Sequence, residues 1–555
     1  MPRIPPELSF QQRRDGDDPL AHLGQIAHLA EMDELGCGEW TVLYEYKDNR
    51  NGSRCSYSAL LSPDKAEDAL KRPAWDLMIG QGGPGFTQRY DNGSEVTTYD
   101  RFGMYGVEPL LYCRDFHGMK PRQYDISEEF RLYLNLYHDR HNDRYIHVDD
   151  RGNEVVAAEI DLGRARVLTR LLREYMAARQ LALALFFDHR AQSDLDLATA
   201  ESAIAAIDKT TADRCYSFSI GNIDRKAFSR LIGKKILLPP PIAECGAWPY
   251  DVEQPAQYVD FIVDVDEKGN SVLHSCDPGG LANYFGANEH APHYLTPVWF
   301  RRDVLSKYYD QSDKFSVEDG YLRCGSLWGI QIDNNMPDHV VVYLGDLGRD
   351  LPYEEQVYWR TFNVTSGGRQ SSATNFRRAF RAEFADPSEP DLLFKQRYTQ
   401  LNEAWLAKFE WPLYRSPHAG DAHIFKQFRL PISEGLGEFD SQLLSLVKLV
   451  IDSLNEAELA KAAGALANEK GITKFERYLR GGNYPNVDRD IAALRVLQNL
   501  RSSGVAHAKG KNFDKIQGNV GLDRDSPRTV FRNLLNGVNQ MLSDLSAHFV
   551  SAADD

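Results

Sequence analysis

The sequence predicts a multidomain protein in which an α+β N-terminal region, in two parts, is followed by an all-α helical bundle. The chain has 555 residues, which is more than one hydrophobic core usually supports. Strand and helix patterns are mixed as far as residue 364, whereas every strong pattern after residue 426 is helical. Between these regions, residues 365–391 are small and polar and are interrupted by Gly and Pro, which is typical of a linker.

Residues 1–204 are expected to form the first α+β domain, and nothing in them indicates a function. Segment 39–48, EWTVLYEYKD, alternates and is rich in aromatic and β-branched residues, which predicts a strand. Segment 128–139, EEFRLYLNLYHD, suits either a helix or a half-buried strand. Segment 164–187 predicts a helix that continues as a strand over LALALFF. The residues at helical spacing in it are Val167, Leu168, Leu171, Leu172 and Met176.

Residues 205–364 are expected to form a second, β-rich α+β domain. Segment 257–276 predicts a hairpin that turns over EKGN. Segment 327–347 predicts another hairpin, which turns over NNMP. Between the two, segment 296–310, TPVWFRRDVLSKYYD, predicts a helix.

Residues 365–425 are expected to hold the linker and a connecting helix, and residues 426–555 a helical bundle. Apolar residues repeat at helical spacing in segments 438–454, 487–500 and 526–549. The last of these segments starts with Ser526 as N-cap and proline at the first helical position, a combination that helix starts favour. Amphipathic helices of this kind bury their apolar faces against one another in a bundle.

Basic residues are concentrated in the predicted bundle, although the chain as a whole is acidic, with a net charge of −16. Residues 471–540 contain four Lys and eight Arg against six Asp and Glu, so that this stretch carries +6 and the remainder −22. A basic module on an acidic body suits a polyanionic ligand such as a nucleic acid. An ordinary imbalance of surface charge is the alternative.

The sequence has no pattern of membrane insertion, secretion or metal binding. No apolar run approaches the roughly 18 residues that a membrane span needs, and the first residues lack the apolar core of a signal peptide. The seven cysteines are scattered and none forms a CxxC pair, which argues against a disulfide framework and a zinc site. We therefore expect a cytoplasmic protein that needs no metal or other cofactor.

Each of three motifs can be interpreted either as a functional site or as an ordinary structural element. GQGGPGF, from Gly80, lacks the GK[ST] ending of a phosphate loop and fits a plain flexible loop. YHDRHNDRYIHVDD, from Tyr137, is rich in metal-ligating residue types but fits the solvated tip of a hairpin. FRRAFRAEF, from Phe376, interleaves arginines with aromatic residues, which suits nucleic-acid binding and also an amphipathic helix that packs on a neighbour. Its arginines are Arg377, Arg378 and Arg381, and its aromatic residues are Phe376, Phe380 and Phe384.

One further segment, LRSSGVAHAKGKNF, carries residues suited to RNA cleavage. Arg501 offers a fork of donors for phosphate oxygens, and His507 can transfer a proton near neutral pH. Together they suffice for a metal-independent reaction, in which the 2′-hydroxyl attacks the neighbouring phosphorus, the histidine moves the proton and the arginine stabilises the phosphoryl charge. Affinity for the RNA backbone would come from three nearby lysines, which are Lys509, Lys511 and Lys515.

The spacing of Arg501 and His507 requires a distortion of the helix. Six residues at about 100° each put the two side chains some 120° apart on a straight helix, and therefore on different faces. Ser502, Ser503 and Gly504 are poor residues for a helix interior, which predicts a break or a bulge between the two. The alternative is a glycine helix stop followed by a basic loop.

This segment and the predicted bundle, residues 426–555, resemble the HEPN superfamily, particularly its Apea-like branch. The family signature is a helical bundle that carries an arginine, four to six residues and then a histidine, which is matched here by Arg501, five residues and His507. The resemblance implies a metal-independent ribonuclease, often a toxin or an anti-phage effector. It also implies a homodimer in which two such motifs form one composite site.

The resemblance assigns roles to individual residues. Arg501 would contact the phosphate, His507 would act as acid and base, and Ser502 would support them where many members have Asn or another stronger hydrogen-bonding residue. RNA would be the ligand, and the N-terminal region would bind an unidentified trigger that controls the cut. The alternatives are a non-catalytic regulator, whose bundle dimerises or binds nucleic acid, and an unrelated enzyme in residues 1–360.

Overall fold

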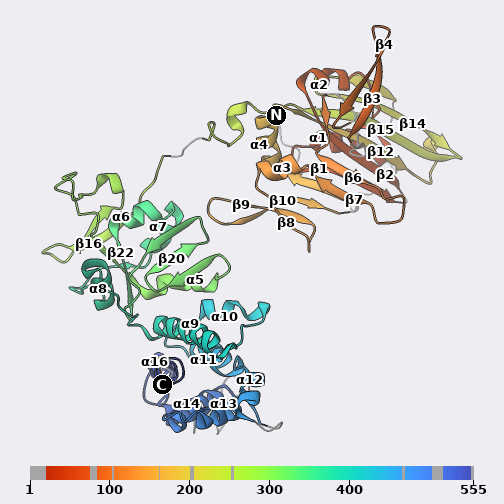
Figure 1. Cartoon of the computed structure of the whole chain (residues 1–555). Coiled ribbons are helices and arrows are strands. Elements are labelled where there is room, and N and C mark those ends of the chain that lie inside the picture. Colours follow the sequence, from red (N-terminus) through yellow and green to blue (C-terminus); the bar gives the residue numbers. More distant parts are fainter. Residues whose placement is uncertain are drawn as a thin grey trace. The chain divides into compact units, whose positions relative to one another are not determined.

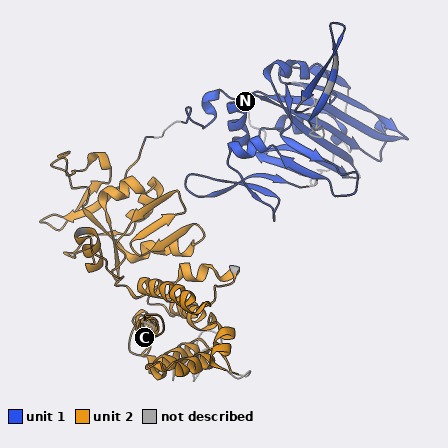
Figure 2. Cartoon of the chain, viewed as in Figure 1, with its two compact units in different colours: residues 1–255 blue, residues 256–555 orange. Residues whose placement is uncertain are grey.

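The chain folds into two compact units, unit 1 of residues 1–255 and unit 2 of residues 256–555 (Figure 2). No helix in the described part of the chain is long and apolar enough to cross a membrane. The structure, a computed structural model, describes residues 20–49, 51–75, 84–102, 106–161, 163–199, 206–251, 255–464, 469–502 and 517–551.

Unit 1 is built on one large antiparallel sheet, in which 11 strands are described (Figure 1). The strands pair with neighbours that are often distant in the sequence, and β5 (Val107–Glu108) pairs with β2 beside the main path. In sheet order, the path is β13 (Ile207–Thr210), β14 (Arg214–Ile223), β15 (Lys226–Leu237), β12 (Ala182–Gln192), β2 (Gly52–Leu61), β1 (Trp40–Asn49), β11 (Arg164–Leu168), β10 (Glu154–Ile160), β9 (Arg144–Val148) and β8 (Tyr137–Asp139).

Helices cover both faces of the sheet at β12. Leu183 of this strand lies in one apolar cluster with Leu171 of α4 (Thr169–Arg179). The neighbouring Ala182 lies in another cluster with Ala66 of α2 (Pro63–Ala69). Successive strand residues point to opposite faces, so the two helices bury the strand from both sides. The other elements of unit 1 are η1 (Ala21–Leu23), α1 (Gln25–Glu34), the hairpins β3 (Gly85–Asp91) with β4 (Ser94–Asp100) and β6 (Leu111–Arg114) with β7 (Gln123–Ile126), α3 (Glu128–Tyr133), η2 (Leu197–Thr199) and η3 (Ile242–Glu244).

The predicted strand over segment 39–48 is confirmed as β1, and segment 128–139 divides into α3 and β8. In segment 164–187 the predicted helix is wrong for Val167 and Leu168, which end β11 before α4 begins. These two residues are buried because β11 lies between β1 and β10 in the sheet, and not because they face a helix stripe. The solvated hairpin expected around Tyr137 is present as β8 and β9.

The sheet of unit 1 extends beyond residue 204, where the sequence pattern changes. The strands β13 to β15 return to it, and β15 pairs with β12 from Leu183↔Leu237 to Gln192↔Phe228. Burial favours this return, since Leu231 and Ile236 of β15 are almost completely buried. The two units divide at residue 255.

The first part of unit 2 consists of short antiparallel strands with helices. The hairpin predicted over segment 257–276 is confirmed as β16 (Asp260–Val265) and β17 (Ser271–Ser275). The remaining strands form two sheets, β22 (His339–Tyr343), β18 (Pro297–Arg301) and β23 (Asn363–Val364), and β19 (Phe315–Glu318), β20 (Tyr321–Cys324) and β21 (Trp328–Gln331). The helices are η4 (Pro278–Gly280), η5 (Arg302–Leu305), α5 (Ser306–Asp310), α6 (Leu344–Asp350) and α7 (Tyr353–Arg360).

One prediction for this part is wrong and another is confirmed only in part. Segment 296–310 begins as strand β18 and becomes α-helical only at Ser306, because β18 lies between two other strands and buries its consecutive apolar residues. Segment 327–347 turns back over NNMP, and Asp333 and Val341 exchange backbone hydrogen bonds as an isolated antiparallel bridge, but the strands on either side do not form the expected hairpin, since β21 pairs with β20 and β22 pairs with β18. The buried Asn334 between them donates to the carbonyl of Glu318 and accepts from the N–H of Gly320, so it bridges to another turn.

The described residues from about 370 to 550 form only helices and connecting loops, so the predicted order of an α+β region and an all-α region is confirmed. The stretch expected as a linker contains a helix, α8, whose start is capped by Ser372. The predicted helix over 487–500 is confirmed with the same bounds, and Ser526 caps the last long helix as expected. The helices are α8 (Ala373–Arg381), α9 (Pro390–Phe409), η6 (Ala419–Asp421), α10 (His423–Gln427), α11 (Leu436–Val447), the π-helical turn η7 (Lys448–Asp452), α12 (Glu456–Ala463), α13 (Gly471–Gly481), α14 (Val487–Leu500), α16 (Pro527–Leu545) and the π-helical turn η9 (Ser546–Val550).

One apolar core unites α9 with the helices α10 to α14 and α16. Phe394 and Trp405 of α9 belong to the same buried cluster as Leu494 of α14 and Phe531 of α16. The buried core of the helical part therefore begins before residue 426, and α9 lies inside it rather than connecting to it from outside.

A buried ionic cluster joins the two parts of unit 2. Arg302 of η5 lies 3.2 Å from a carboxylate oxygen of Asp391 and 3.5 Å from one of Glu389, both at the start of α9. Glu389 is also paired with Arg532 of α16 at 2.8 Å. Buried charges are costly unless they are paired, so the contact favours one arrangement of the β-rich part and the helices.

Candidate functional site

Arg501 lies at the C-terminal end of α14, where the helix meets the turn η7. Its Nη1 lies 2.9 and 2.8 Å from the two carboxylate oxygens of Asp452, the last residue of η7. The side chains are 34% and 41% exposed, so the pair lies at the surface. Leu497 and Leu500 anchor this end of the helix in the apolar core, which fixes where the arginine emerges.

The π-helical turn positions Asp452. The N–H of Ser453 donates to the carbonyl of Lys448 at 3.1 Å, which closes the wider ring of a π turn. This extra residue in the turn leaves Leu449 and Val450 in the core and brings the carboxylate of Asp452 to the surface beside Arg501. Turns of this kind occur often at functional sites.

Ser502 follows Arg501, and its hydroxyl donates to the carbonyl of Asn499 at 3.1 Å. The hydroxyl is therefore bonded to its own helix. The other predicted site residues, His507, Lys509, Lys511 and Lys515, lie outside the described residues. The expected pairing of Arg501 with His507 stays a prediction.

Asp452 also lines a hollow of about 430 Å³, which we call the Asp452 hollow. It is bounded by α9, α10, η7 and the loop that follows α9. The loop is held by Asn402 of α9, whose side chain bonds the N–H and the carbonyl of Tyr414 at 2.9 and 3.0 Å. The lining residues with functional side chains are Tyr398, Arg415, His418, Asp421, Lys448 and Asp452.

Each charged group of the Asp452 hollow has a partner of opposite charge or a carbonyl. Lys448 lies 3.1 Å from Asp421, and Arg415 donates to the backbone carbonyl of Asp452 at 3.4 Å. Deeper in the hollow, the hydroxyl of Tyr398 lies 3.4 Å from that of Ser453, and burial raises the pKa of this tyrosine to about 12. The tyrosine therefore stays neutral at physiological pH.

The sequence did not indicate this hollow. Its cationic residues, Arg415 and Lys448, are more than 30 residues apart along the chain, and neither belongs to a motif. Packing brings them together, because an isolated antiparallel bridge joins Tyr414 to Leu454 at the end of η7. Within the sequence, the loop 415–418, RSPH, is the one local pattern of polar residues that could have drawn attention to the hollow.

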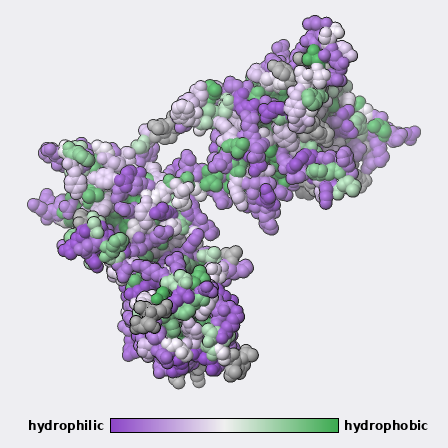
Figure 3. Space-filling model, viewed as in Figure 1, coloured by the Kyte–Doolittle hydropathy of each residue, from purple (hydrophilic) through white to green (hydrophobic). Residues whose placement is uncertain are grey.

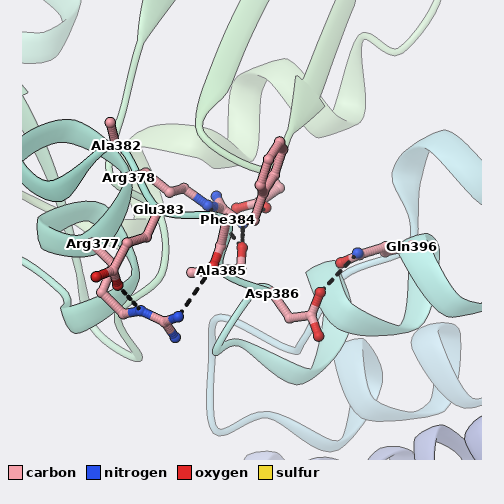
Figure 4. A pocket seen from close by; sticks show the side chains of 9 residues that line it. Arg377, Arg378, Ala382, Glu383, Phe384, Ala385, Asp386 and Gln396 are labelled. Carbon is pink, nitrogen blue, oxygen red and sulfur yellow. Dashed lines mark hydrogen bonds and ion pairs between the residues drawn. The ribbon is translucent and has the colours of Figure 1, made fainter.

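A second hollow, of about 820 Å³, lies at the end of α8 (Figure 4). Arg377 pairs with Glu383 at 3.0 Å, and Arg378 pairs with Asp319 at 2.7 Å. Phe384 is fully exposed, so the expected packing of the aromatic residues onto a neighbour is wrong for this residue. Arg377 and Arg378, which suited either nucleic-acid binding or a packed amphipathic helix, are thus held by carboxylates and by the carbonyls of residues 384 and 385.

The face seen in Figure 3 and the metal-ligating side chains of the described residues give no further indication of a site. On the visible face, apolar patches are small and lie between hydrophilic residues (Figure 3). In the part of the chain that the structure describes, no three His, Cys, Asp or Glu side chains are grouped so as to hold a metal ion.

No protein-family model, curated protein or solved structure matches this chain.

Proposed function

We propose that the protein is a metal-independent RNA endonuclease of the HEPN type, in which the helical part cuts and the N-terminal region responds to a trigger. Arg501 binds the scissile phosphate, and His507 moves the proton from the 2′-hydroxyl to the leaving 5′-oxygen. A bond forms between the 2′-oxygen and phosphorus and the bond to the 5′-oxygen breaks, which leaves a 2′,3′-cyclic phosphate and a 5′-hydroxyl. Lys509, Lys511 and Lys515 bind the RNA backbone, and two subunits complete the site.

The observation that carries the proposal is the position of Arg501. Its guanidinium is at the surface, on the end of a helix that is anchored in the core, and both of its contacts with Asp452 come from Nη1. A guanidinium can bind a phosphate through two donors in one plane, so its remaining N–H groups are suited to an RNA phosphate. The net positive charge of residues 471–540 supports a polyanionic ligand.

The alternative is a non-catalytic regulator that dimerises or binds nucleic acid through the helical part. The Arg501–Asp452 pair favours this alternative, because it already gives the arginine a structural role between α14 and η7. The bond from the Ser502 hydroxyl to its own helix favours it as well, because it gives that hydroxyl a structural role.

A cleavage assay distinguishes the nuclease from the non-catalytic regulator. It uses single-stranded RNA, EDTA and the purified full-length protein. We expect wild-type protein to cut, with or without extract from phage-infected cells as the source of the trigger. We expect Arg501→Ala and His507→Ala to lose at least about 100-fold in rate, the usual effect of removing an acid–base group or a charge-stabilising donor. The matched control is Arg495→Ala, which removes another surface arginine of α14 that is paired with a carboxylate, that of Glu476.

Intact RNA under all these conditions contradicts the proposal, and so does a His507→Ala protein that cuts at the wild-type rate. In the alternative, both variants keep their biological activity, whereas a change on the apolar face of α16, such as Val538→Asp, abolishes it.

A further inference from the structure

The Asp452 hollow combines an apolar floor with a rim of two cations and two carboxylates. Tyr398 forms part of the floor and stacks on Tyr414, with ring centroids 4.7 Å apart. Ile424 and Leu449 complete the floor and are almost completely buried. A flat ligand group placed there would contact aromatic and aliphatic side chains. Their positions are fixed by packing in or against the core of the helical part.

The two cations of the rim have different partners within the protein. Lys448 is paired with Asp421, and the side chain of Arg415 reaches only a backbone carbonyl, that of Asp452. Both cations belong to exposed or half-exposed side chains. An anionic ligand group could take the place of the Asp421 carboxylate on Lys448 and add a charged partner to Arg415, so the rim suits a phosphate.

His418 adds a directional group to the rim. Its Nδ1 accepts a bond from the N–H of Gly420 at 3.3 Å, so that the neutral ring carries its proton on Nε2. The ring is therefore a donor toward any acceptor on its other side, such as a phosphate or a carbonyl oxygen of a base.

Asp452 is shared between this hollow and Arg501. The backbone carbonyl of this residue binds Arg415, and its carboxylate binds Arg501. Both arginines therefore contact the same residue, which places the hollow and Arg501 next to one another.

We propose that the Asp452 hollow binds one nucleotide of single-stranded RNA, next to the phosphate that Arg501 holds. The base lies on the floor formed by Tyr398, Ile424 and Leu449, and its phosphate lies between Arg415 and Lys448. The volume of about 430 Å³ is within the range of small-molecule sites, about 300–1,000 Å³. Stacking on an aromatic ring with a phosphate on nearby cations is the usual chemistry of single-strand binding. This inference rests on the proposed function, since it takes RNA as the ligand.

The test measures binding of a fluorescent single-stranded RNA of about 12 nucleotides, a length within the range that such sites cover. The full-length protein carries His507→Ala so that the RNA stays intact. We expect Lys448→Gln and Arg415→Gln each to raise Kd about fivefold and to lower the salt dependence of log Kd by about 0.7. Lys461→Gln is the matched control, because Lys461 also forms a surface pair with a carboxylate, that of Glu458. It should bind as the parent does.

Competition with small ligands measures how much the apolar floor of the hollow contributes to RNA binding. Uridine 5′-monophosphate should displace the RNA at a concentration at least about tenfold lower than inorganic phosphate, because stacking adds to the phosphate contact. Equal potency of the two competitors overturns the inference, since it shows an anion site without a base. Equal or better competition by polyglutamate also overturns it, in favour of an acidic protein segment as the ligand.

Failure of the nucleotide-binding inference can be distinguished from failure of the nuclease proposal. If Lys448→Gln and Arg415→Gln bind RNA as the parent does while cutting still depends on Arg501, the inference fails and the proposed function stands. If both variants weaken binding but the wild-type protein never cuts RNA, the inference stands and the nuclease proposal fails.

Discussion

The Nη1 atom of Arg501 lies 2.9 and 2.8 Å from the two carboxylate oxygens of Asp452, and this pair connects the end of α14 with the turn η7. The carboxylate partly neutralises the guanidinium that an RNA phosphate would bind, because both are anions that the guanidinium binds through its N–H groups. Asp452 is therefore a competitor of RNA for Arg501. A surface pair of this kind contributes little to stability, so RNA can displace it at low cost.

Removal of the competing charge should strengthen RNA binding. We expect Asp452→Asn to lower the Kd for single-stranded RNA about fivefold, because Arg501 loses its anionic partner and the site loses one negative charge. The free energy of unfolding should fall by less than about 1 kcal/mol. Fluorescence anisotropy and urea unfolding measure the two effects.

The control for this change is Asp488→Asn. Asp488 belongs to the same helix as Arg501 and is paired with Arg480 at 2.6 Å, so its removal changes the net charge equally. If Asp452→Asn weakens RNA binding, or if Asp488→Asn strengthens it to the same extent, competition for Arg501 is not the cause.

Arg302 should be essential for the stability of unit 2. Burial on its own would raise the pKa of Asp391, but Arg302 and the N–H of Leu430 hold it below its usual value, so the carboxylate is charged. Arg302→Ala leaves this charge and that of Glu389 buried, with one partner fewer. We expect a loss of about 3–5 kcal/mol in the free energy of unfolding.

Pulse-labelling hydrogen exchange in urea measures this loss in peptides of unit 2. Arg301→Ala is the matched control, since Arg301 is the preceding residue, is half-exposed and pairs with the partly exposed Asp303. It should cost less than about 1 kcal/mol. Equal effects of the two substitutions would show that the buried cluster does not hold the two parts together.

Unit 1 should lose stability as the pH falls below about 6.5. His28 of α1 is buried against the sheet, and its Nε2 lies 3.0 Å from the Ser229 hydroxyl. Burial, and then the nearby His189, lower the pKa of His28 to about 4. The other charged or titratable groups that face it are Glu31, Arg54 and His22.

The direction of this pH dependence follows from the lowered pKa of His28. The unfolded chain binds the proton near pH 6.5 and the folded chain only near pH 4, so stability is complete above pH 6.5 and is lost as the pH falls toward 4. At 1.36 kcal/mol per pH unit, His28 should account for about 2 kcal/mol between pH 7 and pH 5. The measurement is the urea midpoint of peptides from β12 and β15, again by pulse-labelling exchange. His28→Gln should remove this part of the pH dependence, while the exposed His141→Gln should leave it intact. A pH dependence that is the same in wild type and His28→Gln contradicts the account.

Local patterns predicted α14 and the start of α16 well. The bounds of α14 and the cap at Ser526 depend on apolar spacing and on residues within one turn, which the sequence contains directly. The strand β18 was predicted as a helix because its apolar residues are consecutive, and only its two neighbours in the sheet make it a strand. The partners of β21 and β22 could not be predicted, since they depend on strands elsewhere in the chain.

The candidate site, like the fold, could be predicted only where its residues lie close together in the sequence. Arg501 was found because its motif is short and continuous in the sequence. Tyr398, Arg415 and Lys448 were missed because they come from α9, a loop and η7, which only the packing of the helical part brings together. The partner of Arg501 was missed for the same reason, since Asp452 precedes it by 49 residues.

The most direct test of the central claim is cleavage of a single-stranded RNA in EDTA, compared with the same strand carrying 2′-deoxyribose throughout. The account predicts that wild-type protein cuts the RNA to products that end in 2′,3′-cyclic phosphate and 5′-hydroxyl groups, and that the deoxyribose strand stays intact because it lacks the attacking oxygen. Cleavage of both strands, or products that end in 5′-phosphate, would contradict a reaction in which Arg501 and His507 direct the 2′-hydroxyl to the phosphorus.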